Sequence, residues 1–389
     1  MRNLLEKEGV LSELINMIQS DTISKCCLVW MMAMLTMVST GCIFQNGSDY
    51  VSGGTILDLR ANTLIGTDEH LYVLTGKAVC LDWEGTTIWE SQKLGGWGMV
   101  FLGDGFFAKT YDQSSKKGGV AFLNLNGEIL WQEETRLIST IAIDASQNLL
   151  AAGTRDGVLW VFSKAGDVLW TYTNYVEIDQ VVVALDSSCV IFTDYHRYLT
   201  CVREGEVVWS KTVKGIYEGG SNRIMACSPD SSYFVYRSEE GRSKMVASTL
   251  EGKEIWSVPL ESELRSVAVT SDGTAIIAGC RGAVYKFTSA GILVWKIDVG
   301  ADNQYIAITP EADYIAVGSA SPFSHLILLS GEGEVLWKAR SSDNIFAVGI
   351  SPNGKYVVFS NRLGKLYIYS NPPETSETES SYYYTARIQ

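Results

Sequence analysis

Short apolar runs separated by polar turn residues recur along most of the chain. Residues 139–170 show the pattern with few irregularities, with apolar runs at 140–143, 149–152, 158–162 and 168–170 and clusters of Asp, Ser, Lys and Gly between them. Runs of this length, bounded by such residues, are typical of strands joined by tight turns. The pattern therefore predicts a four-stranded antiparallel sheet as the local unit of structure.

The fourth run of each unit carries a repeated motif: a glycine, three mostly apolar residues and a tryptophan. The motif occurs seven times, and the residue before the tryptophan is always aliphatic. Successive tryptophans are 42, 39, 39, 47, 39 and 42 positions apart. A fixed period of about forty residues indicates a repeat architecture. The seven residues are Trp89, Trp131, Trp170, Trp209, Trp256, Trp295 and Trp337.

The strands of these units do not alternate cleanly between apolar and polar positions. Segments such as VLWVF, EVVW and ILVW are apolar on both faces, and such strands are expected to be covered on both faces. Four-stranded sheets packed radially around an axis satisfy this requirement, which predicts a β-propeller. Each repeat tryptophan is then expected to dock one blade on the next, because burying an indole contributes a few kcal/mol.

The two ends of the repeat region predict how the ring closes. Seven units that end in Trp span residues 62–337, and residues 345–370 supply three further strands. The segment 54–58 (GTILD) has the form of a fourth strand, with Asp58 at the tryptophan position. Strands from both termini would then share one blade and remove exposed sheet edges. The sequence predicts eight blades, with seven as the alternative.

The N-terminal part predicts export. Residues 26–38 form an apolar run that is shorter than the ~20 residues of a membrane-spanning helix, and its length fits a signal peptide. Ser39, Thr40 and Gly41 precede Cys42. This arrangement resembles a lipobox and predicts that the thiol of Cys42 carries a lipid. The alternatives are an uncleaved N-terminal anchor or a buried helix of a cytosolic protein.

Four segments follow from these patterns. Residues 1–41 are predicted to be the signal segment, 42–53 a flexible tether and 54–370 the propeller. Residues 371–389 are rich in Ser, Thr and Glu and are predicted to be a disordered polar tail. Three consecutive tyrosines at 382–384 leave a docking role for this tail as an alternative.

Charge and cysteine spacing exclude several classes of function. The formal net charge of −13 argues against nucleic-acid binding and against docking on anionic lipid headgroups. None of the eight cysteines belongs to a CxxC pair, so the sequence gives no support for zinc or iron–sulfur sites. Cys189 and Cys201 fall on consecutive strands of one predicted hairpin. They can form a disulfide only if the register places them on one face.

The sequence contains no recognisable catalytic constellation. His70, His196 and His325 lie in different units, and no GxSxG, HExxH, P-loop or dinucleotide-binding glycine motif is present. No catalytic, cofactor-binding or metal-binding residue is therefore predicted, although a calcium site built from several turns stays open. Turn carboxylates are expected to cap backbone donors; they include Asp104, Asp156, Asp230, Asp272 and Glu311.

The units resemble the pyrroloquinoline-quinone (PQQ) type propeller repeat, most closely at 150–170 and 275–295. The resemblance covers residues 54–370 and implies a propeller fold. Enzymes of that family bind quinone and calcium beside a vicinal disulfide, whereas the only adjacent cysteines here, Cys26 and Cys27, lie in the export segment. Non-catalytic relatives include a lipid-anchored propeller of the bacterial outer-membrane barrel-assembly machinery, which this chain resembles in outline.

These observations favour a monomeric, non-catalytic scaffold on the extracytoplasmic side of a membrane, anchored by lipid and binding proteins or glycans. The first alternative is a quinoprotein-like, PQQ-dependent enzyme or another propeller enzyme. The second is an intracellular scaffold. The longer insertion around residues 217–220 is where partner contact is expected first.

Overall fold

The computed structural model describes residue 51 and residues 54–185, 189–215, 224–239, 243–320 and 324–373. The chain divides into two compact units, Met1–Asp49 and Tyr50–Gln389, and all described residues belong to the second. Cys42, the insertion at 217–220 and the tyrosines at 382–384 lie outside the described residues, so export, lipidation and the docking role of these segments remain predictions. Within the described ranges no helix has the length and apolarity of a membrane span.

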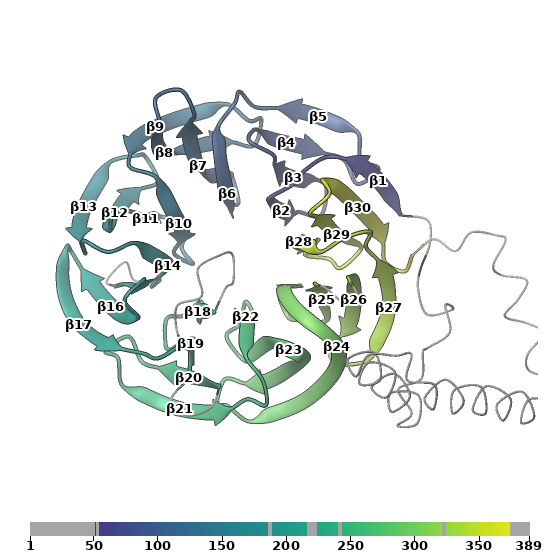
Figure 1. Ribbon diagram of the computed structural model, residues 1–389. Coiled ribbons are helices and arrows are strands. Elements are labelled where there is room, and N and C mark those ends of the chain that lie inside the picture. Colours follow the sequence, from purple (N-terminus) through teal and green to yellow (C-terminus); the bar gives the residue numbers. More distant parts are fainter. Residues whose placement is uncertain are drawn as a thin grey trace, which may run out of the picture. The chain divides into compact units, whose positions relative to one another are not determined.

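The described residues form strands and no helix, arranged as eight antiparallel blades around a ring (Figure 1). Blade 1 contains β2 (Thr63–Gly66), β3 (Leu71–Leu74), β4 (Ala78–Leu81) and β5 (Thr87–Glu90). Blade 2 contains β6 (Gly95–Leu102), β7 (Gly105–Asp112), β8 (Lys117–Asn124) and β9 (Ile129–Thr135). Blade 3 contains β10 (Ile138–Ile143), β11 (Leu149–Thr154), β12 (Val158–Ser163) and β13 (Val168–Thr173). Blade 4 contains β14 (Ile178–Val183), β15 (Val190–Asp194), β16 (Tyr198–Arg203) and β17 (Glu206–Thr212).

Blade 5 contains β18 (Met225–Cys227), β19 (Phe234–Ser238), β20 (Lys244–Ser248) and β21 (Glu254–Pro259). Blades 6 and 7 form one continuous sheet of β22 (Leu264–Val269), β23 (Ala275–Thr288), β24 (Leu293–Ile308), β25 (Tyr314–Ser319), β26 (His325–Ser330) and β27 (Val335–Arg340). The two long strands explain the continuity. β23 fills both middle positions of blade 6, and β24 is the outer strand of blade 6 and then the inner strand of blade 7.

Blade 8 closes the ring with strands from both ends of the propeller. It contains β28 (Ile345–Ile350), β29 (Tyr356–Asn361), β30 (Lys365–Ser370) and β1 (Thr55–Asp58). β1 pairs antiparallel with β30, and Asp58 forms an ion pair with Lys365. The predictions of an all-β fold, of eight blades and of closure by both termini are confirmed.

The register corrects one detail of this closure. Trp337 pairs with Leu328, the fourth residue of β26, whereas the fourth residue of β30, Ile368, pairs with Thr55. Thr55 therefore occupies the tryptophan position of blade 8. The prediction that Asp58 does so is wrong. Asp58 lies four residues after Gly54, as each tryptophan does after its glycine, but it pairs with Lys365 and not with the fourth residue of β30.

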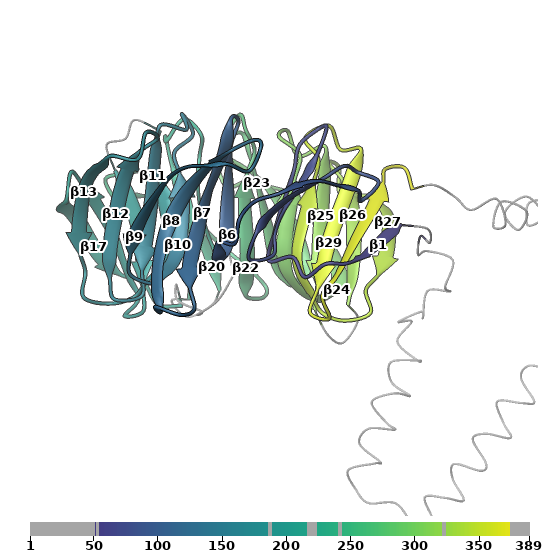
Figure 2. The ribbon, with the colours of Figure 1, turned by 90° about the horizontal axis from the view of Figure 1, so that it is seen from above.

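The core of the propeller lies between neighbouring blades, while hairpin turns gather at the two opposite faces of the ring (Figure 2). One cluster joins Phe107 and Phe122 of blade 2 to Leu150 and Phe162 of blade 3, and all four side chains are buried. Every residue of β11 is buried. For middle strands, the prediction that both faces are covered is therefore correct.

For the outermost strands the same prediction is wrong. Val161 pairs with Trp170 and Phe162 with Val168, so Leu169 has no partner and forms a β-bulge. The same irregularity precedes all seven repeat tryptophans. The aliphatic bulge residues are 42–59% exposed. A bulge disrupts the free edge of a sheet and so opposes edge-to-edge association. The bulge residues are Ile88, Leu130, Leu169, Val208, Ile255, Val294 and Leu336.

Candidate interaction surface

Most of the repeat tryptophans contact the blade that follows their own. The indole N–H of Trp131 donates to the carbonyl of Lys164 at 3.0 Å, and that of Trp209 donates to Leu250 at 2.7 Å. Trp256 and Trp295 make the equivalent bonds to Ser289 and Gly331. The closing blade has no such turn, and Trp337 of blade 7 donates instead to the side-chain oxygen of Asn371 at 3.1 Å.

The motif glycine lies against the indole of the preceding blade. Gly166 has a φ of +98°, and a Cβ at this position would lie 2.8 Å from the ring of Trp131. Both the left-handed backbone and the close approach of the ring require glycine. Trp89 lies over Gly127 in the same way. Trp170 differs, because it lies in the core between blades 3 and 4 but has no atom within 4 Å of a Cβ built on Gly205.

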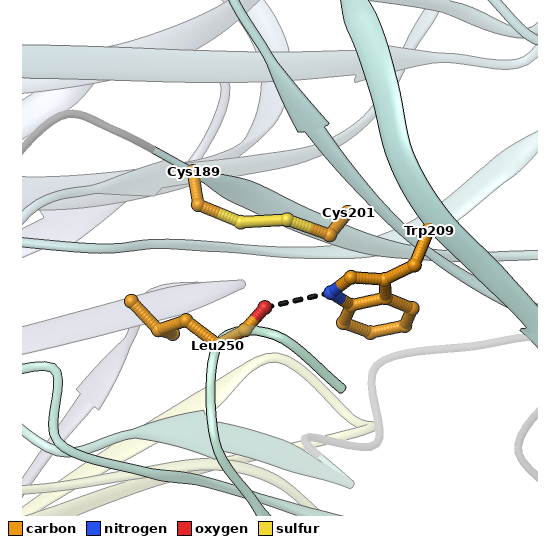
Figure 3. The surroundings of a disulfide bond; sticks show 4 residues. All are labelled: Cys189, Cys201, Trp209 and Leu250. Carbon is orange, nitrogen blue, oxygen red and sulfur yellow. Dashed lines mark hydrogen bonds between the residues drawn. A yellow bond between two sulfur atoms is a disulfide. The ribbon is translucent and has the colours of Figure 1, made fainter. Parts of the chain in front are cut away.

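Cys189 and Cys201 form a disulfide within blade 4 (Figure 3). β15 and β16 pair Ile191 with Cys201, so Cys189, two residues earlier, lies on the same face in a diagonal position. The Cα atoms of the two cysteines are 6.2 Å apart, and both residues are fully buried. The register thus meets the condition for the disulfide that the sequence left open.

The three histidines lie in different blades. His70 lies in the turn between β2 and β3, His196 lies between β15 and β16, and His325 begins β26. Asp104 pairs with Lys164 at 2.7 Å, and Asp156 pairs with Arg136 at 3.6 Å. Within the described ranges no group of three or more His, Cys, Asp or Glu residues has the geometry to hold a metal ion.

Two of the predicted turn carboxylates, Asp230 and Asp272, act as local caps. Asp230 accepts hydrogen bonds from the backbone and hydroxyl of Ser232, and Asp272 does so from Thr274. The hydroxyl of Thr270 adds a further bond to Asp272 at 2.6 Å. With Thr270 as the largest cause, these bonds lower the pKa of Asp272 to about 2. The ionised carboxylate is therefore the form that the folded turn prefers.

This preference predicts a pH dependence. We expect Asp272→Ala to lower the melting temperature at neutral pH. Because the folded-state pKa is depressed, the stabilising effect is present above the unfolded value of about 3.9 and is lost as pH falls through about 2. Circular dichroism melts at several pH values should show the gap between wild type and variant closing across that window. A gap of constant size would contradict the prediction.

One charged cluster stands out at the boundary of blades 5 and 6. Arg237 lies on β19, and its side chain is 3% exposed. Its guanidinium donates to the carboxylates of Glu239 and Glu263, the latter at 2.5 Å, and to the carbonyl of Leu264 at 3.3 Å. Arg265 pairs with the other oxygen of Glu263 at 2.9 Å. The cluster therefore joins two blades by charge-assisted hydrogen bonds.

The carboxylates of this cluster reach the surface, while Arg237 lies beneath them. The side chains of Glu239 and Glu263 are 38% and 27% exposed, and both oxygens of Glu263 are paired with arginines. The cluster also adjoins both described ends of the longest insertion. Glu239 donates its backbone N–H to Lys214, and Arg237 donates its backbone N–H to Ile224. The sequence missed this cluster; the one available signal was an arginine inside the otherwise apolar segment YFVYRS.

The bidentate role of Arg237 can be tested with a conservative change. We expect Arg237→Lys to lower the free energy of unfolding by about 1–2 kcal/mol, because an ammonium cannot reproduce the planar fork that bridges two carboxylates and a carbonyl. Arg136→Lys is the matched control, since that side chain is 78% exposed and its ion pair should contribute less than about 0.5 kcal/mol. Urea denaturation measures both. Equal losses would contradict a special role for Arg237.

Comparison with known proteins now identifies the family. A family model described as outer membrane protein assembly factor BamB matches residues 58–221 and 242–371, which is more than half of the chain. The chain belongs to this family. The predicted PQQ-like propeller repeat is thereby confirmed, and the family indicates a protein-binding scaffold. A curated relative, a putative neurobeachin homolog of Caenorhabditis briggsae, is 24% identical over 238 residues, covering 59% of this chain but 8% of that protein.

Solved structures share the fold of this BamB-family propeller at low sequence identity. The crystal structure of BamB from Moraxella catarrhalis has a TM-score of 0.57 and 14% identity, covering 81% of this chain and 98% of that chain. The C-terminal WD40 domain of Sif2 has a TM-score of 0.62 and 11% identity, covering 82% and 98%. The computationally designed Ika8 protein has a TM-score of 0.66 and 13% identity, covering 81% and 97%.

Proposed function

We propose that this protein is a non-catalytic, membrane-anchored scaffold on the extracytoplasmic side that binds a protein partner at the boundary of blades 5 and 6. The observation that carries the proposal is the support of Glu239 and Glu263 by the buried Arg237. Charged groups that are fixed before binding lose little conformational entropy when a partner docks. Membership of the BamB family supports a role in protein binding.

The chemistry of the surface indicates the kind of partner. The side chain of Glu239 is 38% exposed and is bonded to Arg237 through one oxygen, so a partner that presents Arg or Lys would complement this carboxylate. Such pairs contribute mainly to specificity and to the rate of association.

The disulfide supports a location outside the cytoplasm. Disulfides persist in oxidising compartments and are rare where glutathione and thioredoxin keep thiols reduced. The bond between Cys189 and Cys201 therefore agrees with the export segment predicted at 1–41 and with lipid attachment at Cys42.

Partner binding is tested by crosslinking in intact cells. The full-length protein, its Glu239→Gln variant and its Glu332→Gln variant would be purified from membranes after treatment with a cleavable crosslinker. Glu332 is a matched control, because it is an exposed turn carboxylate of blade 7. We expect the same partner with wild type and Glu332→Gln, and about tenfold less with Glu239→Gln, which corresponds to about 1.4 kcal/mol. Equal recovery from all three would overturn the proposed surface.

Anchoring is tested separately. Radiolabelled fatty acid should be incorporated into the wild-type protein and not into Cys42→Ala, and detergent phase separation should move that variant from the detergent phase to the aqueous phase. Label on the variant, or none on the wild type, would refute lipid attachment at Cys42.

A further inference from the structure

The ring has an abrupt step between blades 1 and 2. β3 and β4 are four residues long, whereas β7 and β8 have eight residues each. Pairing with the inner strands aligns Leu71 with Gly105 and Leu74 with Ala108. The four additional residues of β7, 109–112, therefore all lie at the end that carries the turn to β8. At about 3.4 Å per residue, the hairpin of blade 2 extends about 14 Å beyond that of blade 1.

A pocket of about 640 Å³ lies against this step. Leu94, on the connection between the two blades, accepts a hydrogen bond from the backbone of Tyr111 and donates one to Gly76, both at 2.8 Å. This connection holds the two hairpins together at the pocket. On blade 2, Asp112 pairs with Lys117 across the hairpin, and Gly119 pairs with Glu134. The volume lies within the range of ligand sites in proteins.

Several polar groups of the pocket are held by neighbouring side chains. Asp112 accepts hydrogen bonds from the hydroxyls of Ser114 and Ser115, both at 2.7 Å, and Lys117 pairs with Glu134 at 2.7 Å. These contacts fix two acceptors and a donor along one wall. Lys93 and Gln132 also line the pocket. Their side chains have no partner among the described residues, so their donor and acceptor groups are available to a ligand.

The composition of the lining selects a ligand class. Two lysines and two carboxylates cancel in formal charge, which gives a phosphate no net attraction. Apart from Leu94, which is 4% exposed, Tyr111 and Gly118, the lining residues have polar side chains, so the pocket offers mainly hydrogen-bonding groups. A hydroxyl group both donates and accepts, and adjacent donors and acceptors satisfy it. We propose that this pocket binds a neutral saccharide chain.

This site is separate from the protein-binding surface at blades 5 and 6, so each can fail without the other. The probes are soluble hexasaccharides of glucose and of N-acetylglucosamine, tested on the full-length detergent-solubilised protein by saturation-transfer NMR and calorimetry. We expect at least one probe to bind with a Kd of about 1 mM or tighter. Lys93→Ala and Gln132→Ala should each weaken binding about three- to tenfold, which corresponds to the loss of one hydrogen bond.

Two controls keep the test decisive. Lys253→Ala removes an exposed lysine from a turn of blade 5 and should leave saccharide binding unchanged. Melting temperatures of all variants would show whether each is folded. Elution of the wild-type protein from a saccharide resin by the soluble probe would give a second readout. Absence of binding by both probes, or binding that Lys93→Ala and Gln132→Ala leave intact, would overturn the proposal. Capture of a protein that these two variants lose would also overturn it, in favour of a protein site.

Discussion

Trp131→Ala is expected to lower the free energy of unfolding by about 3–5 kcal/mol, the range for removing a large aromatic side chain from a core. The indole lies against Gly166 and donates its N–H to Lys164 of the next blade. It also packs near the rings of Phe107, Phe122 and Phe162, with ring centroids 5.8–6.1 Å apart. Alanine would leave a cavity between two blades and an unpaired carbonyl.

Trp170→Ala is the matched control for this prediction. Trp170 has the same motif position, yet the described residues give its N–H no hydrogen-bond partner, and it does not lie over the glycine of the next turn. We expect its replacement to cost about half as much, because only apolar contact is lost. Guanidinium denaturation, monitored by tryptophan fluorescence and circular dichroism, would measure both variants. Equal losses would show that the indole hydrogen bond and the glycine contact contribute nothing measurable.

The sequence predicts the architecture well because the same pattern of apolar strands and polar turns, ending in a glycine and a tryptophan, occurs seven times. A single apolar run such as 158–162 does not distinguish a strand of a sandwich from one of a propeller, but the period of about forty residues does. Ring closure is also predictable, since three strands at 345–370 need a fourth and the segment 54–58 is available. The register of that fourth strand is not predictable, because a four-residue strand has too few side chains to fix it.

The sequence leads to a wrong prediction for the aliphatic residues before the repeat tryptophans, which the pattern predicts to be buried and which are exposed. Leu169 and its six equivalents are aliphatic, and the pattern places them in the core, whereas they lie at bulges on the outer edge. An exposed aliphatic bulge residue and a buried strand residue look alike in a single sequence. The difference lies in strand register, which pairing geometry decides and which hydrophobic pattern does not show.

The candidate surface depends on contacts that no sequence pattern encodes. Arg237 and Glu263 come from different blades and are 26 positions apart. Nothing in their spacing resembles a motif, and the cluster forms only when two sheets pack side by side. The pocket at the step likewise arises from a difference in length between two neighbouring hairpins. Repeats predict what all blades share, whereas binding sites depend on where particular blades differ.

Leu57→Asp is expected to destabilise the propeller by about 3 kcal/mol or more, because it places a carboxylate against a buried apolar cluster without a partner. Leu57 pairs with Leu366 and lies 3.0 Å from the Cβ position of Gly85 in blade 1. It therefore joins the closing strand to the first blade. Release of β1 would also expose the edge of β30, so we expect soluble oligomers or aggregates on size-exclusion chromatography.

Ile56→Asp separates closure of the ring from strand propensity. Ile56 directly precedes Leu57 in β1, is 56% exposed and pairs with Tyr367 in the same strand ladder. The substitution carries the same loss of strand propensity without burying a charge, so we expect a loss below about 1 kcal/mol and a monomeric elution profile. Urea denaturation and size-exclusion chromatography of the pair would decide the matter. If the two variants are equally stable and equally monomeric, packing of β1 on blade 1 does not hold the ring closed, and stability must come from the interfaces between the other blades.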